Sequence, residues 1–179
     1  LEFRRVLFRS GTEKYSLRIY KENLDGDQKP DAIITVNRLD FAVNEASKSQ
    51  MSAKQAELGF MGNFNFIFYY DGGLDKISPE IPVPSSPKAS LKVKFEHIAS
   101  DKYMDIIVDY RVLNACFRNF YTVFEHTPRH VFQWKVFDGL NSSKTEAYSF
   151  TYDKGTLGAQ KDILVMKASM STPKKIQDV

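Results

Sequence analysis

The sequence predicts a mostly β protein of antiparallel meanders, arranged either like propeller blades or like a sandwich, with one helical insertion near residues 42–58. Three observations lead to this prediction. Many segments alternate apolar and polar residues with the period of a half-buried strand. Asp-Gly pairs at 71–72 and 138–139 are typical of hairpin turns. Residues 41–58 lack the alternation and are rich in Ala, Glu, Gln, Lys and Ser, which favours a helix.

The first half of the chain combines strands with the helical segment. Tyr15, Leu17 and Ile19 fall on one face of the first strand, and a polar loop turns the chain into the second, so we expect a hairpin. Ser52 and Gln55 fit a capping box inside the helical segment. The expected elements are strands at 14–20 and 31–38, a helix at 41–58, an aromatic strand at 63–70 and a proline-rich edge strand at 76–83.

The second half of the chain has a regular β pattern. Apolar residues alternate with charged ones from residue 90 onward, and aromatic side chains recur on one face of several segments. The expected strands are at 91–96, 105–110, 117–124, 130–137, 148–152 and 161–166.

A weak internal repeat runs through these strands. Asp31, Asp105 and Asp162 each precede a branched apolar run, 74 and then 57 residues apart. Periods of this size are typical of repeated β-meanders such as propeller blades. The alternative is coincidence, since any all-β protein contains several such strand starts. If the segments are repeats, we expect them to occupy equivalent places in similar meanders.

The loop before the second strand carries oxygen-bearing side chains at alternating positions. Hard cations such as Ca²⁺ prefer six to eight oxygen ligands, and a tight loop with alternating acids supplies them from few residues. The alternative is a water-solvated Asp-Gly turn in which Asp31 caps the strand start. The candidate ligands are Asn23, Asp25, Asp27 and Asp31.

The segment from Asn23 to Val36 resembles the loop-and-strand unit of FG-GAP and VCBS-type repeats, which occur in α-integrin-like β-propellers and many exported bacterial proteins. Their motif reads Asp-x-Asp/Asn-x-Asp-Gly-x-x-Asp before an apolar strand. The resemblance implies a Ca²⁺ site to which Lys29 also contributes its carbonyl. Asn23 replaces the usual first acid and Gln28 replaces a glycine, so we expect weak affinity. A complete propeller needs at least four blades, so the resemblance implies a fragment of a larger repeat protein or a smaller relative.

The two ends differ from the rest of the chain. Residues 1–10 resemble the translation of a sequencing adapter, and we expect them to be foreign to the fold. Without them the formal charge falls from +3 to +1, so the charge favours no nucleic-acid partner. We expect one β-rich domain at 11–170 and a polar tail at 171–179. No apolar run is long enough for a membrane-spanning helix.

Other residues offer alternative chemistry. A glycosidase-like hydrolase could use carboxylates around residues 96–109, namely Glu96, Asp101, Asp105 and Asp109. His97, His126 and His130 could serve as ligands or bases, and Cys116 could serve as a nucleophile, although a small buried thiol is the commoner outcome. Aromatic side chains beside Lys and Arg residues could stack on bases or sugars, but core and cross-strand packing is the commoner explanation for most of them. They are Tyr69, Tyr70, Tyr110, Tyr121, Trp134 and Tyr148.

Together these patterns favour a non-catalytic binding or structural module of bacterial type. The resemblance implies that it is exported, in the periplasm, at the cell surface or outside the cell. We expect a protein or carbohydrate ligand, and a hydrolase is the alternative function.

Overall fold

The computed structural model describes residues 13–27, 29–48, 62–140, 145–156 and 160–169. The expectations for residues 1–10 and 171–179, for the capping box in the helical segment, and for Gln28 lie outside this part of the chain.

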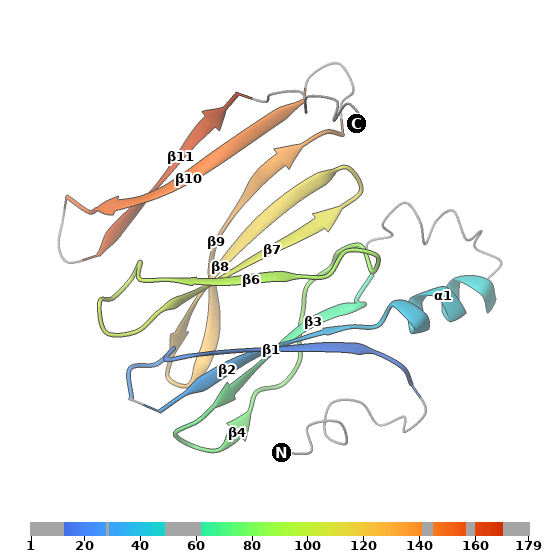
Figure 1. Cartoon of the computed structure of the whole chain (residues 1–179), viewed down its shortest axis with the longest axis horizontal. Coiled ribbons are helices and arrows are strands. Elements are labelled where there is room, and N and C mark those ends of the chain that lie inside the picture. Colours follow the sequence, from blue (N-terminus) through green and yellow to red (C-terminus); the bar gives the residue numbers. More distant parts are fainter. Residues whose placement is uncertain (1–12, 28, 49–61, 141–144, 157–159, 170–179) are drawn as a thin grey trace, which may run out of the picture.

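The described residues form two antiparallel sheets and one helix (Figure 1), so the predicted mostly β fold with a helical insertion is confirmed. The first sheet has the order β1-β2-β3-β4, and β5 also pairs with β3. The second has the order β11-β10-β9-β8-β7-β6. The elements are β1 Ser16–Glu22, β2 Asp31–Asn37, α1 Leu39–Lys48, β3 Asn65–Asp71, β4 Lys76–Ile77, β5 Ile81–Pro82, β6 Lys92–Glu96, β7 Asp105–Val112, β8 Ala115–Phe124, β9 Thr127–Asp138, β10 Glu146–Lys154 and β11 Lys161–Ala168.

The helix begins earlier than the sequence pattern predicts. Asn37 ends β2, and its Oδ1 accepts the Leu39 N–H at 3.1 Å, which satisfies a donor at the start of α1. The Ala42 N–H then donates to the Arg38 carbonyl at 3.0 Å. The donor at the start of the helix is therefore satisfied by an Asn that ends the preceding strand, and not by the Ser52–Gln55 pattern.

Strand β9 also begins earlier than expected, and the turn before it contains no glycine to mark it in the sequence. Glu125 and His126 have φ of 49° and 60°, so two non-glycine residues adopt the left-handed conformation. Pro128 then pairs with Val123 inside the strand. The proline is tolerated there because β10 pairs with β9 only near Asp138, which leaves this part of β9 at a sheet edge.

The main core lies between the two sheets. Ile33, Ile67 and Tyr69 from the first sheet pack with Val108 and Tyr121 from the second, and all five are buried. Burying apolar surface in this way is the dominant favourable contribution to folding, about 25 cal/mol per Å². The two sheets therefore pack against each other as a sandwich does.

The six-stranded sheet curls over a second core. Ile107 and Phe120 lie on the face opposite the first core and pack with aromatic residues of β9 and β10 and with Ile163 of β11. The Lys161 N–H donates to the Ile98 carbonyl at 2.9 Å, so the start of β11 approaches the end of β6. The sheet thus forms a half-barrel, and β7 and β8 are buried on both faces.

Two meanders have the same plan. In both β1-β2-β3 and β6-β7-β8, a Glu that ends the first strand pairs with an Asp that begins the second: Glu22↔Asp31 and Glu96↔Asp105. The loops that join these strands, 23–30 and 97–104, are equally long. Both Asp side chains are buried and accept the N–H of the residue seven positions earlier. Asp162 differs, because it is exposed and is the second residue of the edge strand β11.

In each of these two meanders, the face that carries the leading Asp packs against strands that come later in the chain. Ile33, on the same face of β2 as Asp31, packs on the six-stranded sheet. Ile107, on the same face of β7 as Asp105, packs on β9 to β11. The front of one meander therefore lies on the back of the next.

The leading Asp of the second meander gives a test of this shared plan. We predict that Asp105→Ala lowers the free energy of unfolding by about 1–3 kcal/mol for each N–H left without an acceptor. The two donors are the N–H groups of Ile98 and Ala99, at 3.1 and 2.6 Å from Asp105 Oδ2. The exposed Asp162→Ala should change it by less than about 0.5 kcal/mol. Urea denaturation measures both, and equal effects would contradict the assigned role.

Candidate metal centre

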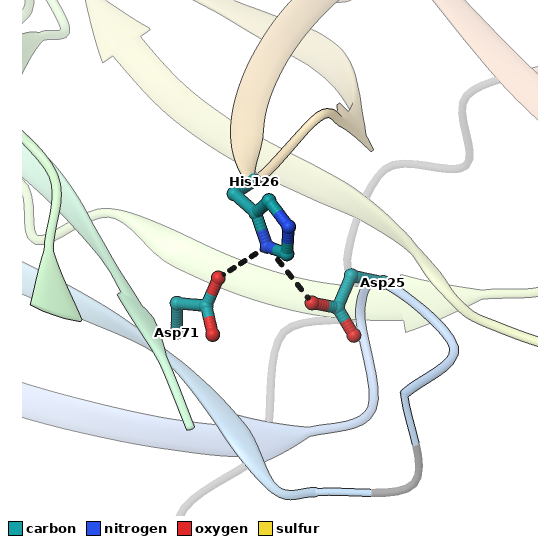
Figure 2. Close-up of side chains that lie close together, drawn as sticks. All are labelled: Asp25, Asp71 and His126. Carbon is teal, nitrogen blue, oxygen red and sulfur yellow. Dashed lines mark hydrogen bonds and ion pairs between the residues drawn. The ribbon is translucent and has the colours of Figure 1, made fainter. Parts of the chain in front are cut away.

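Three parts of the chain meet at one end of the packed sheets (Figure 2). The loop 23–30 leads from β1 into β2 at Asp31. Because β2 and β3 are antiparallel neighbours, the start of β2 lies beside the end of β3, where Asp71 is found. The turn between β8 and β9 brings His126 to the same place. Side chains from both sheets therefore converge here.

Hydrogen bonds within the loop fold it into successive tight turns. Asn23 Oδ1 accepts the Gly26 N–H at 2.8 Å, and Gly26 has a φ of 84°, which a glycine adopts without strain. Asp25 Oδ1 accepts the Asp27 N–H at 3.0 Å. Asp27 Oδ1 accepts the Lys29 N–H at 2.8 Å. The alternating Asn and Asp residues thus determine the backbone path, as Asx turns do.

The structure brings three of the candidate calcium ligands together. One carboxylate oxygen from each of Asp25, Asp27 and Asp31 lies within 4.8 Å of the other two. Oxygens on opposite sides of one Ca²⁺ are about 5 Å apart, so this spacing fits a single ion. Of the other expected ligands, Asn23 directs its Oδ1 to a backbone N–H, and Lys29 lies in the same loop with its Nζ 3.4 Å from the Gly73 carbonyl.

A second group shares Asp25 and adds Asp71 and His126 (Figure 2). His126 Nδ1 is 2.6 Å from Asp71 Oδ2 and 3.6 Å from Asp25 Oδ2. Asp71 is 2% exposed, and its other oxygen accepts the Leu74 N–H at 2.7 Å. The His126 side chain is 52% exposed, so the ring covers the two carboxylates from the solvent side.

The centre of the site concentrates negative charge. Asp31 is fully buried and accepts the N–H groups of Leu24 and Gly72, each at 2.9 Å. Burial raises the pKa of Asp31, and the neighbouring Asp25 and Asp71 raise it further, although the two N–H groups act in the opposite direction. Among the described residues, the ion pairs of Asp25 and Asp71 are both with His126.

The hydroxyl of Tyr69 lies close to the same carboxylates, which affect its pKa. Its hydroxyl donates to Asp25 Oδ2 at 3.4 Å. Burial raises the pKa of this phenol, and Asp31, Asp25 and Asp71 raise it further. Tyr69 therefore remains a neutral hydrogen-bond donor beneath the carboxylates.

Sequence reasoning did not assign Asp71 and His126 to the site. Asp71 belongs to a segment that the pattern assigns to a turn, and His126 belongs to a turn on the other sheet. Asp71 could have been found from the strand register, because the pairing of β2 with β3 places Asp71 beside Asp31. The position of His126 depends on how the two sheets pack, and no local pattern carries that information.

The carboxylates considered for a hydrolase have structural partners. Glu96 Oε1 pairs with Lys161 Nζ at 2.8 Å. Asp105 accepts two backbone N–H groups. Asp109 receives two hydrogen bonds from Arg118, at 2.6 and 2.8 Å, in a bidentate pair. Glu96, Asp105 and Asp109 thus have structural contacts that explain their presence, and no catalytic role is needed to explain them.

The remaining candidates lie at several places in the fold. Asp101 is exposed in the loop after β6. His97 Nδ1 lies 2.9 Å from a carbonyl oxygen of its own loop, and His130 packs its ring edge on a tyrosine. Cys116 is near the start of β8, whereas His126 follows its end, about 30 Å away along an extended strand. Cys116 and His126 therefore cannot form a catalytic pair.

Comparisons with known proteins identify no relative of this chain. No family model matches the chain, and no curated protein or solved structure matches it significantly. The resemblance to FG-GAP and VCBS-type repeats therefore depends on residues 23–36. Within the described residues, no helix combines the length and apolar character needed to cross a membrane.

The raised pKa of Asp31 predicts how stability depends on pH in metal-free buffer. The folded protein binds the Asp31 proton more tightly than the unfolded chain does, so this stabilisation is present below the ordinary value of 3.8 and is lost as pH rises through the raised pKa. The free energy of unfolding of the wild type minus that of Asp31→Asn should therefore decrease as the pH rises from 3.8 through the raised pKa of Asp31. Denaturant titrations of both proteins test this, and a difference that rises with pH would contradict it.

Proposed function

We propose that this chain is a non-catalytic binding or structural module, exported or associated with the cell surface, whose Asp-rich loop is stabilised by Ca²⁺. The observation that carries the proposal is the approach of Asp25, Asp27 and Asp31 oxygens to within 4.8 Å of one another. Carboxylate and carbonyl oxygens favour hard cations. Burial is the main cause of the raised pKa of Asp31, and a divalent cation would offset the negative charge that Asp25 and Asp71 add beside it.

The loop supplies enough donors for a weak calcium site. The three acids, the Asn23 side chain and the Lys29 carbonyl offer five oxygens, and water would complete the six to eight that Ca²⁺ takes. Only three of the donors are charged, so we expect a dissociation constant on the order of 10⁻⁴–10⁻³ M, as in extracellular modules. Such an affinity suits a protein that functions outside the cytoplasm.

The two similar meanders support a repeat architecture of propeller-like type. Asp31 and Asp105 occupy equivalent positions, and the front of one meander packs on the back of the next. A module of this kind presents surfaces and loops for binding and needs no catalytic group.

An aromatic surface on β9 and β10 supports a carbohydrate or protein ligand. Trp134 is 43% exposed and stacks on Phe132, with an interplanar angle of 18°. Tyr148 meets Trp134 edge-on at 6.2 Å and donates its hydroxyl to Glu146. Flat aromatic rings beside polar groups suit the apolar faces and hydroxyls of sugars, and they also suit protein interfaces.

The calcium proposal predicts a rise in melting temperature with the ion. Binding to the folded state alone stabilises by RT ln(1 + [Ca²⁺]/Kd), about 1.4 kcal/mol at a tenfold excess over Kd. For a chain of this size that corresponds to roughly 3–6 °C. We expect this rise in millimolar CaCl₂ relative to EDTA, and we expect Asp27→Ala to abolish it.

The second meander offers a matched control for this experiment. Asp101 stands in the loop 97–104 where Asp27 stands in the loop 23–30, and both are exposed. Asp101→Ala should leave the calcium-dependent rise unchanged. All melts are run at one ionic strength, so that screening cannot imitate binding. Equal melting temperatures with and without Ca²⁺, or an unchanged rise in Asp27→Ala, would overturn the proposal.

A further inference from the structure

We propose a second divalent-cation site, formed by Asp25, Asp71 and His126, that takes a transition-metal ion of the Zn²⁺ class and links the two sheets. This site does not depend on the calcium proposal. Asp71 ends β3, and His126 lies in the turn between β8 and β9, so neither belongs to the loop motif. Only Asp25 is common to both groups.

The separations of the three side chains fit a small ion. One ligand atom from each lies within 4.8 Å of the other two. Neighbouring ligands of tetrahedral Zn²⁺ are about 3.4 Å apart when the metal–ligand distances are 2.0–2.2 Å. His126 Nδ1 and Asp25 Oδ2 are 3.6 Å apart, close to that value. The 2.6 Å contact with Asp71 must lengthen, and the half-exposed imidazole has room to move.

The same ring nitrogen faces both carboxylates. An ionised carboxylate only accepts hydrogen bonds, so Nδ1 carries the proton in the His126–Asp71 contact. A metal ion can replace this proton and bind the nitrogen lone pair. The imidazole nitrogen separates this group from the all-oxygen loop, because nitrogen donors favour Zn²⁺ and its neighbours over Ca²⁺. Three protein donors leave one coordination position for water.

Neighbouring groups orient the two carboxylates. Asp71 Oδ1 is held by the Leu74 N–H at 2.7 Å, which leaves Oδ2 directed at the ring. Asp25 Oδ1 is held by the Asp27 N–H at 3.0 Å, and its Oδ2 faces the ring and the Tyr69 hydroxyl. Hydrogen bonds of this kind fix metal ligands in position and increase affinity. The ligand oxygens are thus oriented by contacts that the metal does not replace.

A metal ion at this position would connect segments that are distant in the sequence. Asp25 and Asp71 belong to the five-stranded sheet and its loop, and His126 belongs to the six-stranded sheet. The unfolded chain does not hold these groups together, so binding favours the folded protein. The ion would therefore stabilise the packing between the sheets at this end.

Calorimetric titration with ZnCl₂ in calcium-free buffer tests the proposal, with zinc-dependent thermal melts of the same proteins. The informative variant is His126→Asn, because Asn tolerates the left-handed conformation that residue 126 adopts, φ 60°. We expect the wild type to bind one Zn²⁺ and to melt several degrees higher with it. His126→Asn removes a proposed metal ligand. It should therefore weaken Zn²⁺ binding by at least the roughly 10–100-fold that is typical when a group that only hydrogen-bonds to a metal ligand is lost.

Two further variants complete the test. His130→Asn makes the same substitution at another exposed histidine and should bind Zn²⁺ like the wild type. Asp27→Ala disrupts the calcium loop and should also retain zinc binding, so failure of one site is distinguishable from failure of the other. The proposal is overturned if the wild type does not bind Zn²⁺, if His126→Asn binds it equally well, or if His130→Asn loses it. Loss of zinc binding in Asp27→Ala would overturn the independence of the two sites.

Discussion

The buried carboxylate of Asp31 is the interaction on which this end of the protein depends. It accepts the N–H groups of Leu24 and Gly72, so one side chain fixes the loop before β2 and the turn after β3. Burying a charged group is costly unless it is paired or hydrogen-bonded. Here the two donors are neutral, and Asp25 and Asp71 add negative charge nearby. The fold thus concentrates carboxylates where three segments meet, and a bound cation would offset their negative charge.

A comparison within the chain separates the structural role of this carboxylate from its proposed metal role. Asp105 makes the same contact with the residue seven positions earlier, in a loop of equal length. That loop has Ala99 where the first has Asp25, and it gathers no group of acids that could hold a metal among the described residues. The buried Asp is therefore part of how each meander closes its first hairpin. The additional acids of loop 23–30 form the Asx turns of that loop, and they also supply the carboxylates that we propose bind a cation.

The sequence was sufficient for the elements whose signals are local. Alternation predicted the strands because side-chain direction in a strand has a period of two. Of the three Asp-led strand starts proposed as repeats, Asp31 and Asp105 make the same contact, whereas Asp162 does not share it. Helix α1 was placed too late, since its cap belongs to a strand. The turn at Glu125 and His126 has no glycine to mark it. Two of the five metal-ligating residues of the candidate site, Asp71 and His126, are placed by strand register and sheet packing, which bring together residues 55 positions apart.

Calcium coordination by the loop 23–31 is the central claim, and a ¹H–¹⁵N NMR titration with CaCl₂ tests it most directly. Donor oxygens in that loop also accept backbone N–H groups, so coordination must change the environment of those amides. We expect saturable shifts at Gly26, Asp27 and Lys29 and at the Gly72 amide bound to Asp31, with little change in the loop 97–104. No shifts up to several millimolar Ca²⁺, or equal shifts in both loops, would contradict a specific calcium site and leave this segment as a polar turn.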